Sequence, residues 1–167
     1  MAEKKIIIYT DGSCKGNPGP GGWSALIFKK NTTKPDVILS GAEAKTTNNR
    51  MEMTAVVEAL RHIHENHLQS SFITLYSDSS LVIKTLTEGW KRKANVDLWE
   101  ELDLLNEELE VDYQWVRGHN KNRWNEECDR IAYGEAEKIS KKKFTAEMIR
   151  KSSSPGTGMK QQNLFEI

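Results

Sequence analysis

Three short runs of apolar and β-branched residues occupy the first part of the chain, and turn residues separate them. Residues 4–10 form the most apolar run, and residues 23–30 and 36–42 form the next two, with a turn at residues 31–35. Runs of this length and composition are typical of buried strands. The pattern predicts three consecutive strands arranged as an antiparallel meander.

Helical periodicity begins where these strands end. Residues 46–49, with the sequence TTNN, offer several N-caps for a helix that runs to about His67, and its apolar residues recur every three or four positions. Two strands and three helices follow by the same rules, the strands at residues 72–77 and 111–116 and the helices at residues 79–86, 96–109 and 125–143. The last helix can continue after a break at Phe144 and Thr145.

The elements follow one another in the order β-β-β-α-β-α-α-β-α, which places the chain in the α/β class. A helical crossover connects the first three strands to the fourth, and such crossovers join parallel strands with a right-handed turn. We therefore expect the strand at residues 4–10 to pair in parallel with the strand at residues 72–77. Residues 11–22 contain five glycines and two prolines, so they are predicted to form a loop whose backbone can approach a ligand closely.

Length and composition limit the class of protein. The chain has 167 residues, enough for one domain. No apolar run approaches the roughly 20 residues of a membrane-spanning helix, and no signal-peptide core follows the N-terminus. The two cysteines, Cys14 and Cys128, are too few for a disulfide framework or a zinc site. We expect a cytoplasmic monomer with reduced thiols.

Charge is balanced over the whole chain but not along it. There are 24 basic and 24 acidic residues, and the resulting net charge of zero excludes the general attraction of a strongly basic coat protein for nucleic acid. Residues 100–112 are acidic without a basic residue, whereas residues 138–151 are basic with Glu147 as their one acid. Either segment can be a solvated helix face or a local binding surface.

Four acidic residues occupy positions that a shared site requires. Asp11 and Asp78 each follow a predicted strand, and ligands collect at the carboxyl ends of strands in an open α/β sheet. Glu52 and Asp129 lie in the first turns of helices, from which both can project to the same edge. Each acid alone can be a turn residue, a helix cap or a surface charge. The repetition of one pattern, a strand followed by an acid and small residues, favours a shared site.

Carboxylates that meet in one site repel one another, and a divalent cation removes that repulsion. A ligand set made only of oxygen atoms suits Mg²⁺ or Mn²⁺ rather than zinc. Two such ions can activate a water molecule and stabilise the leaving oxygen of a phosphodiester. The pattern therefore favours a metal-dependent phosphodiesterase.

Several motifs that contain these acids resemble those of the type 1 ribonucleases H over about residues 4–138. They occur in the order of that family: YTDGSC at residues 9–14, GNPGPGG at 16–22, TTNNRME at 46–52, SDS at 77–79, NVDLW at 95–99, VRGH at 116–119 and NEECD at 125–129. The resemblance implies a ribonuclease H-like fold, which is a mixed five-stranded sheet flanked by helices, with three antiparallel strands and two parallel ones.

The resemblance also implies an activity and its residues. The expected enzyme is an endonuclease that hydrolyses the RNA strand of RNA/DNA hybrids with little sequence preference and leaves 5′-phosphate and 3′-hydroxyl ends. Asp11, Glu52, Asp78 and Asp129 match the family's catalytic carboxylates, which bind two Mg²⁺ ions, or Mn²⁺ in their place. His119 matches its mobile catalytic histidine, which assists proton transfer or product release.

Recognition of a hybrid requires groups that read the 2′-hydroxyl of RNA and the phosphates of DNA. Asparagine side chains and glycine-loop backbone suit the RNA sugars and the minor groove, a threonine suits a DNA phosphate, and an aromatic ring suits a DNA sugar. The residues that match the family's substrate-binding positions are Gly12, Ser13, Asn17, Thr47, Asn48, Asn49, Ser80 and Trp90. Trp90 can instead be a core residue.

The chain departs from the family pattern in three places. Ser80 stands where the family often has glutamine, and Lys121 stands where a glycine often follows the loop histidine. Many relatives have a longer basic helix-loop, of which this chain has only residues 91–93, KRK. The shorter segment offers fewer phosphate contacts, so a flatter salt dependence of binding is expected. The basic residues 138–151 can compensate for this loss.

The C-terminal residues have the composition of a linker followed by a short motif. Residues 152–158, SSSPGTG, predict that the catalytic domain spans residues 1–151 and that residues 152–167 form a flexible tail. Gln161 to Phe165 resembles the peptides that bind the bacterial replication sliding clamp, which makes the clamp a candidate partner. The same residues can be an unstructured end or a strand that docks on its own domain.

Two rival functions fit parts of the pattern. A non-catalytic module that binds hybrids can share the fold, but it has no need of four mutually repelling acids. Another nuclease of the same superfold, such as a DNA resolvase or an integrase core, can also use clustered carboxylates. The TTNNRME and VRGH segments favour the ribonuclease.

Overall fold

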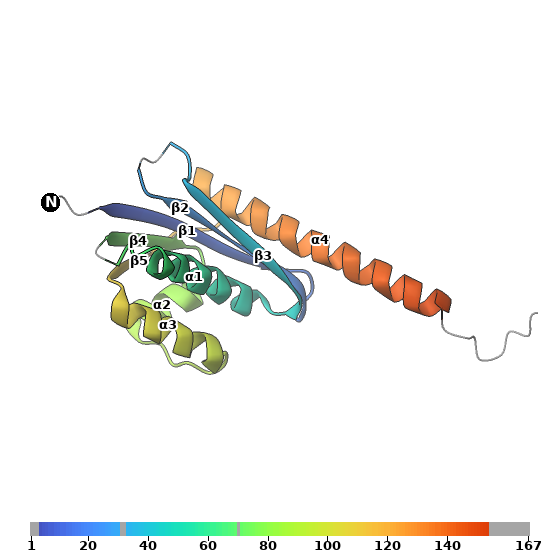
Figure 1. Ribbon diagram of the computed structural model, residues 1–167. Helices are drawn as coiled ribbons and strands as arrows, with labels where there is room; N and C mark the ends of the chain where they lie inside the picture. The colour runs from blue at the N-terminus through green and yellow to red at the C-terminus, as the bar shows by residue number, and fades with distance from the viewer. Residues whose placement is uncertain (1–3, 31–32, 70, 154–167) are drawn as a thin grey trace, which may run out of the picture.

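The computed structural model of the chain describes residues 4–30, 33–69 and 71–153 (Figure 1). Its elements follow the predicted order: β1 (Lys5–Cys14), β2 (Gly19–Phe28), β3 (Val37–Thr46), α1 (Asn48–Glu65), β4 (Phe72–Ser77), α2 (Ser80–Glu88), α3 (Val96–Glu108), β5 (Val111–Trp115) and α4 (Arg123–Ser153). None of the described helices combines the length and the apolar character that a membrane-spanning segment needs.

The five strands form one mixed sheet, as expected. Their order across the sheet is β3-β2-β1-β4-β5. The strands β1, β2 and β3 pair antiparallel, whereas β4 pairs in parallel with β1 and with β5. The register places Thr10 of β1 opposite Ser77 of β4, so the next residues along each chain, Asp11 and Asp78, stand at the same level of the sheet.

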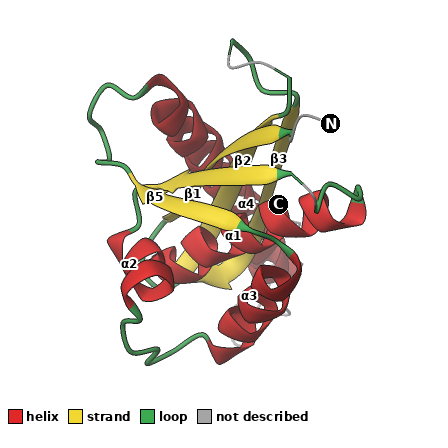
Figure 2. Cartoon of the chain, turned by 90° about the vertical axis from the view of Figure 1, so that its left-hand side faces the viewer, coloured by secondary structure: helices red, strands yellow, loops and turns green. Residues whose placement is uncertain are grey.

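The sheet lies between two helical layers of unequal size (Figure 2). Alternate side chains of a strand point to opposite faces, so Ile6 and Ile8 face the main core under α1 and α3, whereas Ile7 and Tyr9 face a smaller cluster under α4. The main core also receives the apolar stripe of α1, for example Val56 and Leu60. Because the sheet is covered on both faces at β1, the side chains of residues 6–9 are all apolar, without the alternation of a half-exposed strand.

The prediction of a long glycine-rich loop over residues 11–22 is wrong in most of its length. β1 continues to Cys14 and β2 begins at Gly19, so the turn is confined to the four residues between them. The physical reason is close packing, because a Cβ at Gly22 would lie 2.3 Å from the carbonyl oxygen of Ala132 in α4. Glycine here brings a helix close to a strand rather than opening a loop.

The last helix is also longer than predicted. α4 runs without a break through Phe144 and Thr145 and includes Ser152 and Ser153, which the sequence assigned to the tail. Residues 154–167, and with them the motif from Gln161 to Phe165, lie outside the described residues. Cys14 and Cys128 are both free thiols, as expected.

Candidate active site

Three acidic side chains meet at the carboxyl ends of β1 and β4. Asp11 lies in β1, Asp78 follows β4 directly, and Glu52 lies near the start of α1. One carboxylate oxygen of each residue lies within 4.8 Å of the other two. The predicted convergence of these three acids is therefore observed, although they are separated by tens of residues along the chain.

Gly12 allows Glu52 to reach this position. A Cβ at Gly12 would lie 2.3 Å from the backbone nitrogen of Glu52 and 2.4 Å from the carbonyl carbon of Met51, which no larger residue permits. Thr47 fixes the start of the helix, because its Oγ1 accepts a hydrogen bond from the backbone N–H of Arg50 at 3.2 Å. α1 therefore begins directly against β1 and places Glu52, which is 5% exposed, beside Asp11.

Burial and mutual repulsion make these carboxyl groups weak acids. Desolvation, followed by the charge of Asp78, raises the pKa of Asp11 to about 8. Desolvation and the charges of Asp11 and Asp78 also raise the pKa of Glu52 well above its ordinary value. The backbone N–H of Gly12 donates to Oδ1 of Asp11 at 2.9 Å and opposes the increase without cancelling it. In the absence of a cation, the cluster retains protons near neutral pH.

Asp78 is positioned by three neighbours from other parts of the chain. Nδ2 of Asn125 in α4 lies 3.5 Å from Oδ2 of Asp78, and it opposes the increase in the pKa of Asp78 that burial causes. Nε1 of Trp115, the last residue of β5, donates to the backbone carbonyl oxygen of Asp78 at 3.1 Å. Gly118 leaves room for the carboxylate, since a Cβ there would lie 2.9 Å from Oδ2.

These three neighbours were not predicted as functional residues. Asn125 has a signal in the sequence, because it lies one helical turn before Asp129 and therefore on the same face of α4. Gly118 precedes His119 in a quoted motif but reads as a turn residue. Trp115 has no such signal, because only the parallel pairing of β4 with β5 brings its ring to Asp78.

The fourth predicted acid lies beside the cluster of three. Asp129 is half-buried in α4, and its charge raises the pKa of both Asp11 and Asp78. Among the described residues, the group of carboxylate oxygens that lie within 4.8 Å of one another comes from Asp11, Glu52 and Asp78 and does not include an oxygen of Asp129. Asp129 is thus near enough to act on the same charges, but it stands apart from the tight group.

The loop that carries His119 is exposed and conformationally unusual. His119 and Lys121 have φ angles of 55° and 59°, in the left-handed region that glycine adopts most readily. A positive charge on His119 would lower the pKa of Asp78, so the imidazole lies near enough to act on that carboxylate. Lys121, which departs from the family pattern, therefore occupies a backbone position that suits glycine.

Two buried carboxylate oxygens indicate how the cluster is completed. Oδ2 of Asp11 and Oε2 of Glu52 have no hydrogen-bond partner among the described residues. A buried anionic oxygen without a partner costs several kcal/mol in free energy unless a proton or a cation compensates it. The atoms available as metal ligands are all carboxylate oxygens, so the residues present fit a hard divalent cation.

Several predicted substrate-binding residues lie together at the start of α1. The side-chain oxygen of Asn17, in the turn after β1, accepts a hydrogen bond from the backbone N–H of Asn48 at 3.2 Å. Asn17, Asn48 and Asn49 are exposed, whereas Thr47 is half-buried as the helix cap. Ser13 is half-buried in β1 and Ser80 is exposed at the start of α2. Gly12 is buried against α1, so its predicted contact with RNA stays a prediction.

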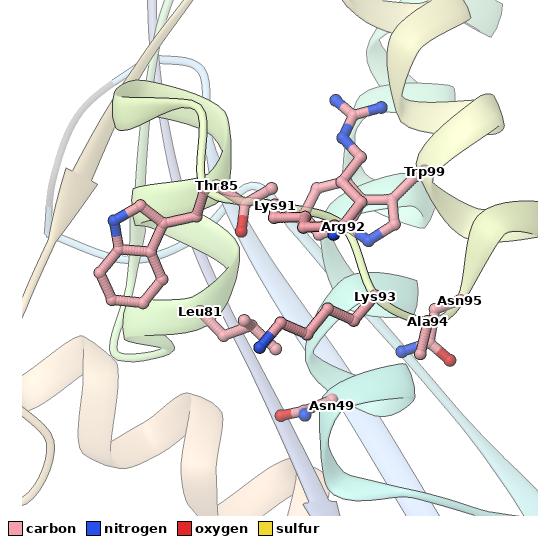
Figure 3. Close-up of a pocket in the computed structure, with 10 residues that line it drawn as sticks. Asn49, Leu81, Thr85, Lys91, Arg92, Lys93, Ala94, Asn95 and Trp99 are labelled. Atoms are coloured by element: carbon pink, nitrogen blue, oxygen red, sulfur yellow. The ribbon is translucent and has the colours of Figure 1, made fainter.

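A basic groove with a volume of about 530 Å³ lies beside these residues (Figure 3). Its lining includes Asn49, Leu81, Trp90 and the basic residues 91–93. Figure 3 shows Lys93 extended across the groove toward Leu81, above Asn49 of α1. Trp90 is 44% exposed and is not a core residue. Exposed aromatic rings next to cationic side chains are typical of nucleic-acid binding surfaces.

Arg50 fixes one wall of this groove. Its guanidinium donates to both carboxylate oxygens of Asp97, at 3.0 and 2.8 Å, and to Oδ1 of Asn95 at 3.2 Å. The same guanidinium lowers the pKa of Asp97 to about 2. The TTNNRME and NVDLW motifs are therefore linked in space, which anchors the connector between α2 and α3.

Comparison with known sequences places these features in a family. A sequence model of the RNase H family matches residues 3–137. The ribonuclease H of Polaromonas naphthalenivorans (strain CJ2) is 46% identical over 142 residues, which cover 76% of this chain and 84% of that protein. The ribonuclease H of Wolbachia pipientis wMel is 41% identical over 145 residues, covering 79% of this chain and 95% of that protein.

Solved structures have the same fold. The N-terminal RNase H domain of Rv2228c from Mycobacterium tuberculosis, fused to maltose-binding protein, superposes with a TM-score of 0.74 at 24% identity, covering 84% of this chain and 99% of that one. LC11-RNase H1, crystallised in complex with an RNA/DNA hybrid, gives a TM-score of 0.70 at 23% identity, covering 80% of this chain and 97% of that one.

Proposed function

The chain belongs to the RNase H family, and we propose that it is an endonuclease that hydrolyses the RNA strand of RNA/DNA hybrids with the help of two divalent cations. The observation that carries this proposal is the meeting of Asp11, Glu52 and Asp78 within 4.8 Å at the carboxyl ends of two parallel strands. A protein that only binds hybrids gains nothing from such a cluster, which raises the free energy of the folded state.

The ligands for the cations would be Asp11, Glu52, Asp78 and Asp129. The two partnerless oxygens, Oδ2 of Asp11 and Oε2 of Glu52, support this assignment. Magnesium is the proposed ion, with manganese as a substitute, because both accept ligand sets of oxygen alone. The chemistry that a bound pair supplies is the activation of a water molecule for attack on phosphorus and the stabilisation of the departing oxygen.

The chain's own residues hold the reacting groups in place. Trp115 and Asn125 fix the backbone and the carboxylate of Asp78, and Gly12 fixes Asp11 through its N–H. His119 lies on an exposed loop, where it can take a proton from the reaction and release it to solvent. Attack by water that breaks the P–O3′ bond leaves a 5′-phosphate on one product and a 3′-hydroxyl on the other.

Substrate recognition is proposed to extend from the carboxylate cluster to the basic groove. Asn17 and Asn48, which are hydrogen-bonded to each other, offer side chains for the RNA sugars, and Thr47 lies beside them for a DNA phosphate. Trp90 and Lys93 offer a ring and a charge in the groove. Contacts of this kind read sugars and phosphates rather than base edges, so little sequence preference is expected.

A cleavage assay with three duplexes tests this function. We expect the protein to cut the RNA strand of an RNA/DNA hybrid with Mg²⁺, and to leave duplex DNA and duplex RNA intact. Asp11→Asn should abolish turnover while hybrid binding, measured by fluorescence anisotropy, is retained. Asp112→Asn, at an exposed position on the edge strand β5, is the matched control and should remain active. Equal cleavage in EDTA, or cleavage of duplex DNA alone, would refute the proposal.

The C-terminal residues support a second, separate proposal. We infer that Gln161 to Phe165, which lie outside the described residues, tether the enzyme to the replication sliding clamp. Such a tether would raise the effective concentration of the enzyme on DNA. A pull-down with purified clamp tests it: Leu164→Ala with Phe165→Ala should abolish capture. Equal capture of a chain that ends at residue 153 would contradict the tether.

A further inference from the structure

The charge of this protein is divided between two parts of the chain. Residues 138–153 contain six basic residues and one acidic residue, a net charge of +5. The whole chain is neutral and residues 154–167 carry one charge of each sign, so residues 1–137 carry a net charge of −5. The match to the RNase H family ends at residue 137. The part that resembles the family is therefore anionic, although its proposed substrate is a polyanion.

The cationic residues lie on a part of α4 that extends beyond the rest of the molecule. Figure 1 shows α4 running in the direction of β1 and continuing past the ends of β1 and β3. Residues 141–153 are all exposed. Just before this segment, Nζ of Lys15, in the turn after β1, lies 3.4 Å from the hydroxyl of Tyr133 and 4.0 Å from Oε1 of Glu137. The helix thus leaves the sheet beside the turn that carries Asn17.

The basic side chains are distributed unevenly around α4. Ala136 faces the sheet, since a Cβ at Gly22 would lie 2.6 Å from its nitrogen. Lys143 and Arg150 follow at intervals of seven residues and so continue this face past the end of the sheet. Lys143 has no ion-pair partner among the described residues, and neither does Lys151, which flanks the same face.

Two lysines on the opposite side of the helix have acidic partners. Lys138 pairs with Glu135 at 3.4 Å, and Lys141 pairs with Glu137 at 3.7 Å. Met148 follows Lys141 on that face after seven residues and is 55% exposed. Lys143 and Lys151 therefore lie on or beside the side of α4 that continues the sheet-facing surface, at the end of the molecule where Asn17 and Asn48 lie. Glu147, one turn from each of them, is the one acid of this segment, so the net charge of the segment stays positive.

We propose that residues 138–153 of α4 form a second contact surface for the phosphate backbone of the hybrid whose RNA strand is cut, an inference that rests on the proposed function. At 1.5 Å per residue, Lys143 and Lys151 lie roughly 21 and 33 Å along the axis of α4 from Asp129. One turn of a duplex is about 34 Å long. A duplex held at the carboxylate cluster and running along α4 would therefore meet these lysines within about one turn of the cut.

This surface would replace phosphate contacts that the short connector at residues 91–93 lacks. Each phosphate contact releases counterions. It therefore steepens the plot of the logarithm of the binding constant against the logarithm of the salt concentration by about one unit. A second copy of the chain is the competing occupant of this helix, through Phe144 and Met148. Docking of two copies through this part of α4 would bring charges of the same sign together, which favours the nucleic acid over such a dimer.

Two pairs of substitutions with equal charge changes test the proposal. Lys143→Gln with Lys151→Gln removes two charges from the sheet-facing side, and Lys138→Gln with Lys141→Gln removes two from the opposite side. Binding of a 24-base-pair hybrid is measured in the Asp11→Asn background, so that it is read independently of cleavage. For the first pair we expect the dissociation constant at 0.1 M salt to rise about tenfold and the salt slope to flatten by about two. The second pair should resemble the parent.

Activity and oligomeric state complete the test. In the active enzyme, the first pair should raise KM for the hybrid and leave kcat and the melting temperature unchanged. An unchanged dissociation constant for the first pair, or equal weakening by both pairs, would overturn the proposal. A concentration-dependent dimer, detected by sedimentation, would also overturn the proposal if Phe144→Ala with Met148→Ala abolished the dimer and left hybrid binding intact. A wild-type enzyme that fails to cut hybrids but still binds them through these lysines would count against the proposed function alone.

Discussion

Gly118 and Asp78 lie so close together that a Cβ on Gly118 would be 2.9 Å from Oδ2 of Asp78. The loop after β5 therefore passes directly over a carboxylate of the candidate active site. The absence of a side chain at position 118 leaves Asp78 free to point toward Asp11 and Glu52. A loop glycine thus acts on the site by steric means, although it carries no functional group.

Replacement of Gly118 by alanine should displace the carboxylate of Asp78 or the loop that carries His119. We expect Gly118→Ala to lower kcat by about tenfold or more and to raise the Mg²⁺ concentration that gives half-maximal activity. The melting temperature should change little, because the loop that carries Gly118 can shift to relieve the contact with Asp78. Steady-state kinetics over a Mg²⁺ titration measures both effects. Wild-type kinetics at every Mg²⁺ concentration would show that the close approach has no role.

Gly134 supplies a contrasting case on α4. A Cβ there would meet nothing within 4 Å, and the residue lies inside a helix, where alanine is favoured over glycine by roughly 1 kcal/mol. Gly134→Ala should raise the free energy of unfolding by about that amount and leave kcat and KM unchanged. Urea denaturation with a parallel cleavage assay measures this. A lower free energy of unfolding would mean that α4 needs glycine for a reason other than space.

Trp115 should prove to be a positioning residue for Asp78. Trp115→Phe keeps the aromatic ring but removes the N–H that donates to the backbone carbonyl of Asp78. We expect about 1 kcal/mol of lost stability, the usual contribution of one hydrogen bond. We also expect a larger loss in kcat than in hybrid affinity, with a higher requirement for Mg²⁺. A variant with normal Mg²⁺ dependence and lower stability alone would assign Trp115 a purely structural role.

The carboxylate cluster should make the metal-free protein less stable at high pH. The pKa of Asp11 is raised to about 8, so proton binding favours the folded state. This contribution is complete below about pH 4 and is lost as the pH rises through about 8. In EDTA, we expect the melting temperature to fall between pH 5.5 and pH 8.5, and Asp11→Asn to reduce that fall. Mg²⁺ should restore stability most at pH 8.5. A pH-independent melting temperature in EDTA would contradict the raised pKa.

His119 should assist turnover without being indispensable. His119→Ala removes a proton carrier on an exposed loop but leaves the carboxylates in place. We expect kcat to fall by about 10²-fold or less, the lower end of the effect of losing a general acid or base, with unchanged hybrid affinity. Partial rescue by added imidazole would support proton transfer. His64→Ala, a substitution on α1 away from the cluster, is the control and should retain full activity.

Most of the architecture could be predicted from local patterns. The order of elements, the antiparallel meander and the parallel pairing of β1 with β4 follow from the spacing of apolar residues and from the handedness of crossovers. The prediction of a loop over the glycine-rich segment is wrong, because its glycines allow close contacts between β1 and α1 and between β2 and α4. A loop and a closely packed strand have the same composition here, and only the position of the opposing helix distinguishes them.

The sequence alone determined which acids could meet, because Asp11 and Asp78 each follow a run of apolar strand residues and the connection between those strands makes them parallel neighbours. Only the tertiary structure decided how the acids are held. The N–H of Trp115, the amide of Asn125 and the space left by Gly118 all reach Asp78 from segments more than 35 residues away along the chain. Periodicity reports which face of an element is buried, but contacts between elements depend on packing distances that no single segment encodes.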